Sequence, residues 1–383
     1  MTVKLLYLVS HPIQYQAPLL RRIATAEDID LTVSFASDDM TGSHWDPGFR
    51  GEIEWNVPLT EGYRWRIDRT AAQVSRAVGD SDVVWLHGWN GPRMWRALAA
   101  ARRLGIPVLM RSENTLDAQP DGAGPRGLAK RAYLRWIFAR SAAFLSIGTA
   151  NRDYYLAHGV DPDRLFSMPY VVDNNFFRTR AVAAVASRDS LRARIGIEPG
   201  QPVILFAGKL QQRKNPLVLI EAFQNLDRSR LNEPKLIFVG DGEQRAEIEH
   251  AAIKNSDICF LGFRDQTELP ALYELADVFV LASHREPWGL AINEAMNAGT
   301  AVIASDQCGG AQDLIDETCG TIVSPGDSES LARALTEILS DLDRCRVMGS
   351  AAAARITAWN FDADLDGLRA ALASSYVAPR TLR

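Results

Sequence analysis

Cysteine is scarce in this 383-residue chain, and its spacing argues against both a disulfide framework and a zinc site. The four cysteines form no Cys-x-x-Cys pair and have no histidine at metal-ligand spacing: Cys259, Cys308, Cys319 and Cys345. Buried, reduced thiols are therefore favoured over a disulfide framework or a zinc site. Asp-x-Asp triplets at 28–30, 161–163 and 362–364 fit a strand entry, a turn and a helix start. We expect no metal and no other cofactor.

Long apolar runs and excess positive charge are also missing. No apolar run approaches the ~20 residues that span a bilayer. The run "LLYLV" at 5–9 is shorter than a signal-peptide core and continues into "SHPIQYQ", so a cytoplasmic protein is expected. The net charge of −5 argues against general nucleic-acid binding, which needs a basic face to neutralise phosphates.

Short apolar runs alternate with helical patterns along the whole chain. The runs expected to form strands are "KLLYLVS", "IDLTVSFA", "VVWLHG", "IPVLMRS" and "AAFLSIG", then "PVILFAG", "KLIFVG", "ICFLG", "DVFVLAS" and "TAVIAS". Nearly continuous apolar strands alternating with helices predict parallel sheets covered on both faces. Residues 173–200 contain no strand and end in a Pro/Gly turn, so they separate two α/β domains. Such domains usually bind a ligand in the cleft between them, at the carboxyl ends of the strands.

Two glutamates in "EPWGLAINEAMNAG" (286–299) indicate a ligand site. Pro287 disfavours a helical conformation at Glu286, and Gly289 allows a backbone to approach a ligand. Glu294 then falls on the second turn of a helix that starts near Gly289. The alternative is that Glu286 caps the helix and Glu294 is a solvated surface acid. A helix N-terminus binds phosphate and a nearby carboxylate accepts ribose hydroxyls, so the pattern favours a nucleoside-diphosphate site.

The same segment resembles the E-x7-E motif of the family 4 retaining glycosyltransferases, which have the GT-B fold. The resemblance extends over the second half through "FAGKLQQRKNPLVLIEAF", "FVGDGE", "FLGFR", "LYELADVFVLAS", "VIASDQCGG" and "GTIVSPGD". The first half is similar more loosely, in "LHGWN", "IGTANRDYYLAHGV" and "MPYVVDNNFF". The resemblance implies two Rossmann-like domains. An acceptor-side domain would span 1–180, a nucleotide-sugar domain 181–360, and a helix in 361–383 would cross back to the first domain.

The resemblance also implies roles for residues of the E-x7-E segment. Glu294 would hold the ribose of the donor, and Glu286 would hydrogen-bond its sugar. Backbone N–H groups of Trp288, Gly289 and Leu290 would face the sugar and the diphosphate.

Other donor-site residues follow from the same resemblance. Gly208 would line the site, and Lys209 and Lys214 would neutralise the diphosphate. Lys209 stands where many members have arginine, which replaces a bidentate contact by a point charge. The backbone around Phe263 and Arg264 would meet the base. The expected activity is a retaining, metal-independent hexosyl transfer from a nucleotide sugar, with uridine as the expected base, to a hydroxyl acceptor.

Polar residues at strand ends of the first half are candidates for the acceptor site. The sequence has "SHPIQYQ" where many members have Gly-Gly, so His11 and Gln14 bring side chains to that strand end. Arg111 and Glu113 follow another strand in "MRSENT". His87 ends "VVWLHG", where a packed structural histidine is the alternative reading. Trp89 and Trp45 are candidates to stack on an acceptor, although most of the tryptophans are expected in packing.

The basic stretch "PRGLAKRAYLRWIFAR" (125–140) allows two readings. It fits a helix lying on an anionic membrane, as a lipid-linked acceptor would require. It also fits an ordinary surface helix with Leu128, Tyr133, Leu134, Ile137 and Phe138 inward. The ordinary helix is favoured, because a solvated basic face is the commoner cause of such a pattern.

Two other functions remain open from the sequence. A nucleotide-sugar 2-epimerase on the same fold would use His11, His87 and Glu113 as acid/base groups and would need no acceptor. A non-catalytic nucleotide-sugar-binding protein is disfavoured by the presence of both glutamates and both lysines. The donor sugar, the acceptor and the oligomeric state do not follow from the sequence.

Overall fold

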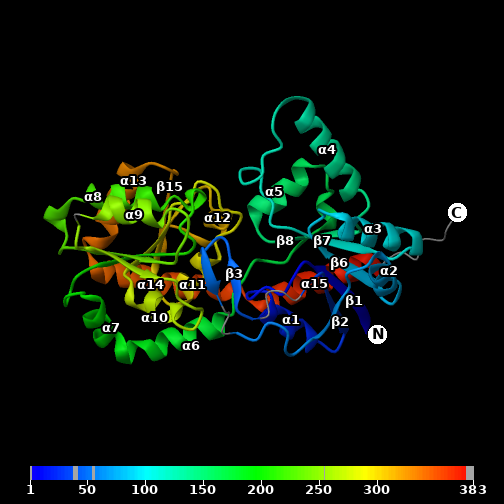
Figure 1. Ribbon diagram of the computed structural model, residues 1–383, viewed down its shortest axis with the longest axis horizontal. Helices are drawn as coiled ribbons and strands as arrows, with labels where there is room; N and C mark the ends of the chain where they lie inside the picture. Colours follow the sequence, from blue (N-terminus) through cyan, green and yellow to red (C-terminus); the bar gives the residue numbers. More distant parts are fainter. Residues whose placement is uncertain (1, 38–41, 54–56, 254, 377–383) are drawn as a thin grey trace. The chain divides into compact units, whose positions relative to one another are not determined.

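The computed structural model describes residues 2–37, 42–53, 57–253 and 255–376, and the chain divides into two compact units. Unit 1 comprises Met1–Gly42, Val57–Tyr170 and Asn360–Arg383, and unit 2 comprises Ser43–Asn56 and Val171–Trp359. Each unit has its own sheet with helices on it (Figure 1). The sequence placed a boundary at 180/181. Contacts place it at 170/171, because α6 (Asn174–Ala184) packs against helices of unit 2.

Unit 1 contains a seven-stranded parallel sheet with the order β5-β2-β1-β6-β7-β8-β9. Its strands are β1 (Val3–Val9), β2 (Ile29–Phe35), β5 (Arg64–Ile67), β6 (Val83–His87), β7 (Val108–Arg111), β8 (Ala143–Ser146) and β9 (Leu165–Ser167). The central strands are buried along nearly their whole length, which is why their sequences are almost continuously apolar.

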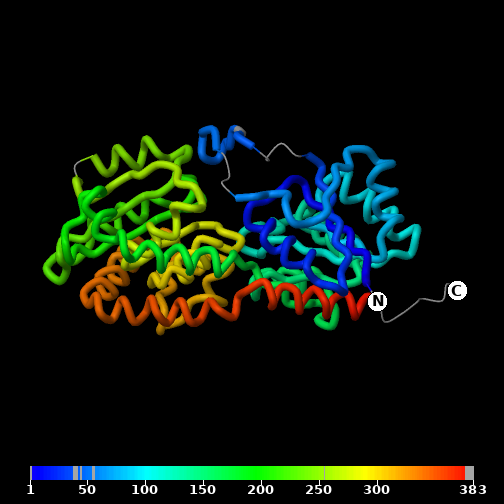
Figure 2. Tube along the Cα trace, turned by 90° about the horizontal axis from the view of Figure 1, so that it is seen from below, coloured from blue at the N-terminus to red at the C-terminus, as the bar shows by residue number. Residues whose placement is uncertain are grey.

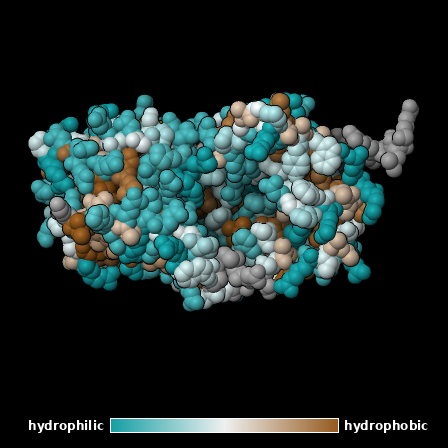
Figure 3. All heavy atoms as spheres, turned by 45° about the horizontal axis from the view of Figure 1, so that its top comes forward, coloured by the Kyte–Doolittle hydropathy of each residue, from teal (hydrophilic) through white to brown (hydrophobic). Residues whose placement is uncertain are grey.

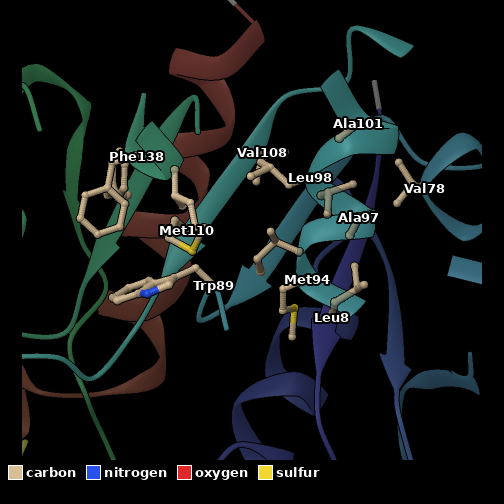
Figure 4. Close-up of a cluster of buried hydrophobic side chains, with 14 of the residues drawn as sticks. Leu8, Val78, Trp89, Met94, Ala97, Leu98, Ala101, Val108, Met110 and Phe138 are labelled. Carbon is tan, nitrogen blue, oxygen red and sulfur yellow. The ribbon is translucent and has the colours of Figure 1, made fainter. Parts of the chain in front are cut away.

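Helices cover both faces of this sheet and bury two separate cores. They are α1 (Ala17–Ala24), α2 (Ala71–Gly79), α3 (Pro92–Leu104), α4 (Gly124–Phe138), α5 (Thr149–Ala157) and α15 (Phe361–Tyr376), with the 3-10 turn η1 (Pro162–Arg164). One core includes Leu8, Met94, Met110 and Phe138 (Figure 4). The other lies under α1 and α15. Figure 2 shows α15 in red beside the blue N-terminal segment, and Arg22 and Arg369 pair with Asp362 and Asp28 there.

Unit 2 contains a six-stranded parallel sheet with the order β12-β11-β10-β13-β14-β15. Its strands are β10 (Val203–Ala207), β11 (Lys235–Val239), β12 (Ile258–Gly262), β13 (Val278–Leu281), β14 (Ala301–Ser305) and β15 (Gly320–Val323). Its helices, besides α6, are α7 (Arg188–Ile195), α8 (Pro216–Gln224), α9 (Arg245–Ala252), α10 (Leu269–Leu275), α11 (Leu290–Asn297), α12 (Ala311–Leu314), α13 (Ser328–Leu339) and α14 (Leu342–Arg355). Short 3-10 turns are η2 (Val185–Ser187), η3 (Gln212–Lys214), η4 (Arg228–Arg230) and η5 (Ile356–Ala358).

Two glycines after β11 let the loops at the carboxyl end of this sheet come together. A Cβ on Gly240 would lie 2.0 Å from the Gly208 carbonyl oxygen, and one on Gly242 would lie 2.5 Å from that of Leu210. Neither position has room for a side chain. The "FVGDGE" segment therefore supports the loop that carries Lys209, and Leu210 donates its N–H to the Asp241 carbonyl at 2.9 Å.

An antiparallel hairpin from the first part of the chain belongs to unit 2. It consists of β3 (His44–Asp46) and β4 (Gly51–Ile53), and its strands pair only with each other. The sequence analysis did not predict it, nor the short edge strands β5, β9 and β15.

The surface of the molecule is mostly hydrophilic on the face drawn in Figure 3, with hydrophobic side chains in small patches. None of the helices among the described residues is both long and apolar enough to cross a bilayer.

Candidate functional site

Glu286 lies in the loop between β13 and α11, and the neighbouring Gly-Gly segment holds its backbone extended. Its N–H donates to the Gln307 carbonyl at 3.1 Å, and the Gly309 N–H donates to the Glu286 carbonyl at 2.9 Å. Gly310 donates to the Trp288 carbonyl at 2.9 Å. The "SDQCGGAQDLI" turn thus pairs with the "EPW" segment like a short strand.

Two cations converge on the Glu286 carboxylate. Its Oε2 accepts hydrogen bonds from Lys214 Nζ at 2.6 Å and from Arg213 at 2.9 Å. Burial alone would raise the pKa of Glu286, but the charges of Lys214 and Arg213 outweigh burial and hold the pKa below its ordinary value. The glutamate is therefore ionised at neutral pH. The three side chains together carry one net positive charge.

The start of α11 lies directly after Glu286. Gly289 caps this helix with φ +98°, and a Cβ there would lie 3.0 Å from Leu281 and 3.2 Å from Ile292. Trp288 is buried, and its indole N–H donates to Asn293 at 2.9 Å. The first N–H groups of a helix have no partner within the helix, and its dipole attracts anions. Gly289 and Leu290 are therefore positioned to meet an anionic group.

Glu294 sits one helical turn further and has no cation in direct contact among the described residues. Its Oε2 accepts a hydrogen bond from the Tyr273 hydroxyl at 2.7 Å. Burial raises the pKa of Glu294 to about 7, although the Tyr273 hydrogen bond and the charge of Lys214 act in the opposite direction. The side chain keeps part of its surface exposed. A ligand that donates hydrogen bonds there would stabilise its ionised form.

Lys209 is bound by the β3–β4 hairpin. Its Nζ lies 2.8 and 2.9 Å from the two carboxylate oxygens of Asp46 and 4.8 Å from the ring centre of Phe49. Burial alone would raise the pKa of Asp46, but Lys209 and the N–H groups of Gly48 and Phe49 keep it low. Phe49 also meets Phe263 edge-on, with ring centres 4.9 Å apart.

The remaining predicted residues of unit 2 line the same strand ends. Gly208 has φ +150°, and the Lys214 side chain passes 3.5 Å from where its Cβ would be. Arg264 pairs with Glu268 at 3.3 Å, at the start of α10. The predicted donor-site residues of this unit thus lie in the loops after β10, β12 and β13 or on α11.

Unit 1 holds a second polar cluster, at the ends of β1, β6 and β7. The Tyr7 hydroxyl lies 2.8 Å from Gln16 Oε1 and 3.0 Å from His87 Nδ1. His87 Nε2 lies 3.6 Å from Glu113, whose carboxylate also accepts a hydrogen bond from the Tyr170 hydroxyl. Burial alone would raise the pKa of Glu113, but these partners hold it below its ordinary value. His87 and Glu113 were predicted together for the acceptor side, and the structure brings them together.

The structure differs from the sequence analysis at Arg111 and Trp89. Arg111 is 2% exposed and donates to the carbonyls of Met168 and Pro169, with Asp364 of α15 at 3.6 Å. Trp89 is 5% exposed and packs against Phe138 (Figure 4). Both side chains are buried in unit 1. Contrary to our expectation, neither has an exposed surface that could contact an acceptor.

His11 and Gln14 lie in the loop before α1. His11 Nδ1 is 2.9 Å from the Ser10 hydroxyl, and the buried Gln14 Oε1 has no hydrogen-bond partner among the described residues. Trp45 is 62% exposed on the hairpin of unit 2, not in unit 1.

Sequence reasoning missed several members of these clusters. Arg213 precedes a predicted residue, and its position in "QQRKN" was a usable signal. Tyr7, Tyr170 and Tyr273 stand in apolar segments where a buried phenol needs a polar partner. The partners His87, Glu113 and Glu294 are distant in the sequence. No sequence signal pointed to Asp46. Among the described residues, no group of three or more His, Cys, Asp or Glu side chains is arranged to hold a metal ion.

Known proteins match both halves of the chain. A family model described as "Glycosyl transferases group 1" matches residues 187–355, and one described as "Glycosyl transferase 4-like domain" matches residues 15–170. The D-inositol 3-phosphate glycosyltransferase of Xylanimonas cellulosilytica is 29% identical over 307 residues, which are 76% of this chain and 71% of that protein. The 2-deoxystreptamine glucosyltransferase of Streptomyces kanamyceticus is 30% identical over 275 residues, 68% of this chain and 69% of that protein.

Solved structures share the fold at low identity. HepE of Anabaena in complex with UDP has a TM-score of 0.75 at 18% identity, covering 97% of this chain and 100% of that one. Its complex with UDP-glucose has a TM-score of 0.72 at 19% identity, covering 98% and 100%. These neighbours, the two parallel α/β units and the matches in both halves agree: the chain belongs to the family 4 glycosyltransferases of GT-B fold, which use nucleotide-sugar donors.

Proposed function

We propose that this protein is a retaining glycosyltransferase that moves a sugar from a UDP-sugar to a hydroxyl acceptor without a divalent metal. The observation that carries the proposal is the contact of Lys214 and Arg213 with Glu286, directly before the start of α11. This arrangement combines an ionised carboxylate, fixed positive charge and a helix N-terminus. A nucleotide sugar needs these three groups for its sugar hydroxyls and its diphosphate.

Cleavage of the bond between the sugar and the diphosphate builds negative charge on the leaving group. Lys214, 12% exposed, is held in place by Glu286 and needs little rearrangement to stabilise that charge. Lys209 would add a second charge once it leaves Asp46. Positive charge fixed by the protein can stabilise the leaving diphosphate as a divalent metal does in other transferases, so we propose a metal-independent mechanism.

Retention of the anomeric configuration is part of the proposal, and the contacts of Glu286 bear on how it would arise. Two charge-assisted hydrogen bonds to Oε2 draw electron density from the Glu286 carboxylate and so weaken it as a nucleophile. In our proposal Glu286 therefore binds a sugar hydroxyl and forms no covalent intermediate. The acceptor attacks from the face that the diphosphate leaves, and a phosphate oxygen takes its proton.

Two further parts of the proposal, uridine as the base of the donor and ribose binding by Glu294, have separate support. HepE of Anabaena, which shares the fold, was solved with UDP and with UDP-glucose. Glu294 lies on the second turn of α11 and accepts from Tyr273 through one oxygen, so its other oxygen can accept from a ribose hydroxyl. For the acceptor we propose only a compound with a hydroxyl group, because the names of the relatives specify different acceptors. His11, Gln14, His87 and Glu113 are our candidates for its contacts.

The experiment is transfer from a panel of UDP-sugars to mixed hydroxyl acceptors, followed by proton NMR of the new linkage. We expect the donor's anomeric configuration in the product and turnover that survives EDTA. An inverted product would refute retention. Loss of turnover on chelation, restored by magnesium or manganese, would refute the metal-free step.

The same assay separates the rival functions. An epimerase would change the sugar of the donor without any acceptor. A binding protein would bind UDP in calorimetry and show neither reaction.

A further inference from the structure

The helices α3 and α4 of unit 1 each lie in a stretch of the chain that has no acidic residue. No Asp or Glu occurs in residues 83–112 or in residues 122–152, although the chain has 47 acids and a net charge of −5. Exposed arginines of these helices are Arg96, Arg102 and Arg103 on α3 and Arg126 and Arg135 on α4. Among the described residues, none of these five has a carboxylate within 4.0 Å. Lys130 and Arg131 do, at Asp121.

The two helices form one surface, because their side chains are in contact. The Trp95 indole N–H of α3 donates to the Tyr133 hydroxyl of α4 at 2.7 Å. At the other end, loss of water contact and the charge of Arg102 lower the pKa of Arg140, which follows α4. The Trp95–Tyr133 contact therefore joins α3 to α4, and Arg102 of α3 is near enough to Arg140 for their charges to interact.

Large apolar side chains stand among these arginines. Leu128 and Trp136 of α4 are 62% and 52% exposed, and Trp95 and Leu104 of α3 are 48% and 53% exposed. The Arg140 guanidinium lies 3.8 Å from the centre of the Trp136 ring. The sequence analysis placed Leu128 inward, and that prediction was wrong.

α4 carries apolar residues on its exposed face as well as on its buried face. The exposed apolar residues of α4 and its C-cap lie along one side of the helix: Pro125, Leu128, Ala129, Ala132, Trp136 and Ala139. The buried ones are Gly127, Leu134, Ile137 and Phe138. A helix at the surface of a water-soluble protein normally turns polar residues outward. An apolar outer face with a basic rim is typical of a helix that lies in a membrane interface.

We propose that the α3–α4 surface, made of Trp95, Leu128, Trp136 and the five exposed arginines, docks on an anionic lipid bilayer. Arginine guanidinium groups pair with lipid phosphates in bidentate fashion, and tryptophan rings are favoured at the level of the headgroups. Leu128, Ala129 and Ala132 enter the upper acyl region, where the lipid chains remove the apolar face of α4 from water. A nucleic acid is the weaker fit, because a phosphate backbone offers nothing to these aliphatic side chains.

The test is flotation of the full-length protein with vesicles of phosphatidylcholine alone or mixed with phosphatidylglycerol. We expect binding to the mixed vesicles and at least about tenfold weaker binding to phosphatidylcholine, with the difference shrinking as salt rises. The proposal is overturned if the protein binds neither kind of vesicle, or if it binds both kinds equally.

Matched variants locate the surface. Arg126→Gln with Arg135→Gln, and separately Leu128→Ser with Trp136→Ser, should each weaken binding to the mixed vesicles by about tenfold. The controls are Arg333→Gln, of a 70% exposed side chain in unit 2, and Ile253→Ser, of a 74% exposed one there, and both should bind as the unaltered protein does. Controls that weaken binding as much would place the lipid site elsewhere. If duplex DNA binds as tightly, and the Leu128/Trp136 variant keeps that binding, the surface is a polyanion site instead.

Discussion

The two units of this protein use charge for different purposes. In unit 2, Lys214, Arg213 and Glu286 carry one net positive charge, and Lys209 is held by a residue of a separate hairpin. In unit 1, Arg111 is a large, fully buried charged side chain, and its Nη2 donates to two main-chain carbonyls of the same unit. A charge whose partners are all internal supports the fold. A group of side chains with excess positive charge, such as Lys214 and Arg213 with Glu286, can bind an anionic ligand. The partners of a charged side chain, more than its burial, therefore distinguish the two roles.

Removal of Arg111 should have the largest effect and should act on stability. Arg111→Ala leaves a cavity in the core and removes the donors of the Met168 and Pro169 carbonyls, which should lower the free energy of unfolding by about 3–5 kcal/mol. Urea denaturation followed by circular dichroism measures it. The matched control is Arg135→Ala, an exposed arginine, with an expected change within about 0.5 kcal/mol. An Arg111→Ala protein as stable as the control would remove the distinction between these two roles of charge.

Loss of Lys214 should instead act on turnover. Lys214→Ala should lower kcat by roughly 10²–10³-fold, because the lysine stabilises charge that grows in the transition state, and should weaken donor binding less. Lys235→Ala is the control, since that lysine bonds the Ser256 carbonyl away from the cluster. A variant with raised KM for the donor and unchanged kcat would make Lys214 a binding group only.

Glu294 should give the donor site a pH dependence near neutrality. Its pKa is raised to about 7, so the unliganded protein is most stable with Glu294 protonated. That contribution is complete below the ordinary glutamate pKa and is lost as pH rises through about 7. Ribose hydroxyls favour the carboxylate, so UDP-glucose affinity should increase as pH rises from 6 to 8.

Calorimetry of Glu294→Gln completes that test. The variant should bind UDP-glucose more weakly by roughly 1.5–3 kcal/mol at pH 8 and should lose the pH dependence. Unchanged affinity with an intact fold would rule out the ribose contact.

The smallest expected effect concerns the hairpin. Asp46→Asn keeps the acceptor oxygen for the Gly48 and Phe49 N–H groups and removes the charge that holds Lys209. Donor affinity should rise, by up to about tenfold, because the diphosphate no longer competes with a carboxylate for that lysine. Glu52→Gln on the same hairpin is the control. Weaker donor binding in Asp46→Asn would mean that Asp46 positions Lys209 for the donor and does not compete with it.

Much of the donor side followed from the sequence, because its signals are local. Pro287 and Gly289 restrict the backbone within a few residues, so the loop, the start of α11 and the position of Glu294 on its second turn were predictable. The role of each residue there is still a prediction. The acceptor side was harder, since its groups come from three strands and its selection rested on polar residues at strand ends. His87 and Glu113, selected in this way, do lie close together, and their acceptor role is still a prediction. Arg111, selected in the same way, is buried and donates to main-chain carbonyls.

The sequence by itself determined the two parallel sheets and most of their central strands, because a strand buried on both faces must be apolar throughout. It also determined where α3 ends, at Gly105 with its left-handed backbone. Only the tertiary structure decided that residues 44–53 belong to unit 2, that Asp46 holds Lys209, and that Trp89 and Arg111 are buried. Edge strands such as β5, with the sequence "RWRI", also escaped prediction. In each case the deciding contact joins residues far apart in the chain, and a local pattern of residue types carries no information about which distant partner will meet it.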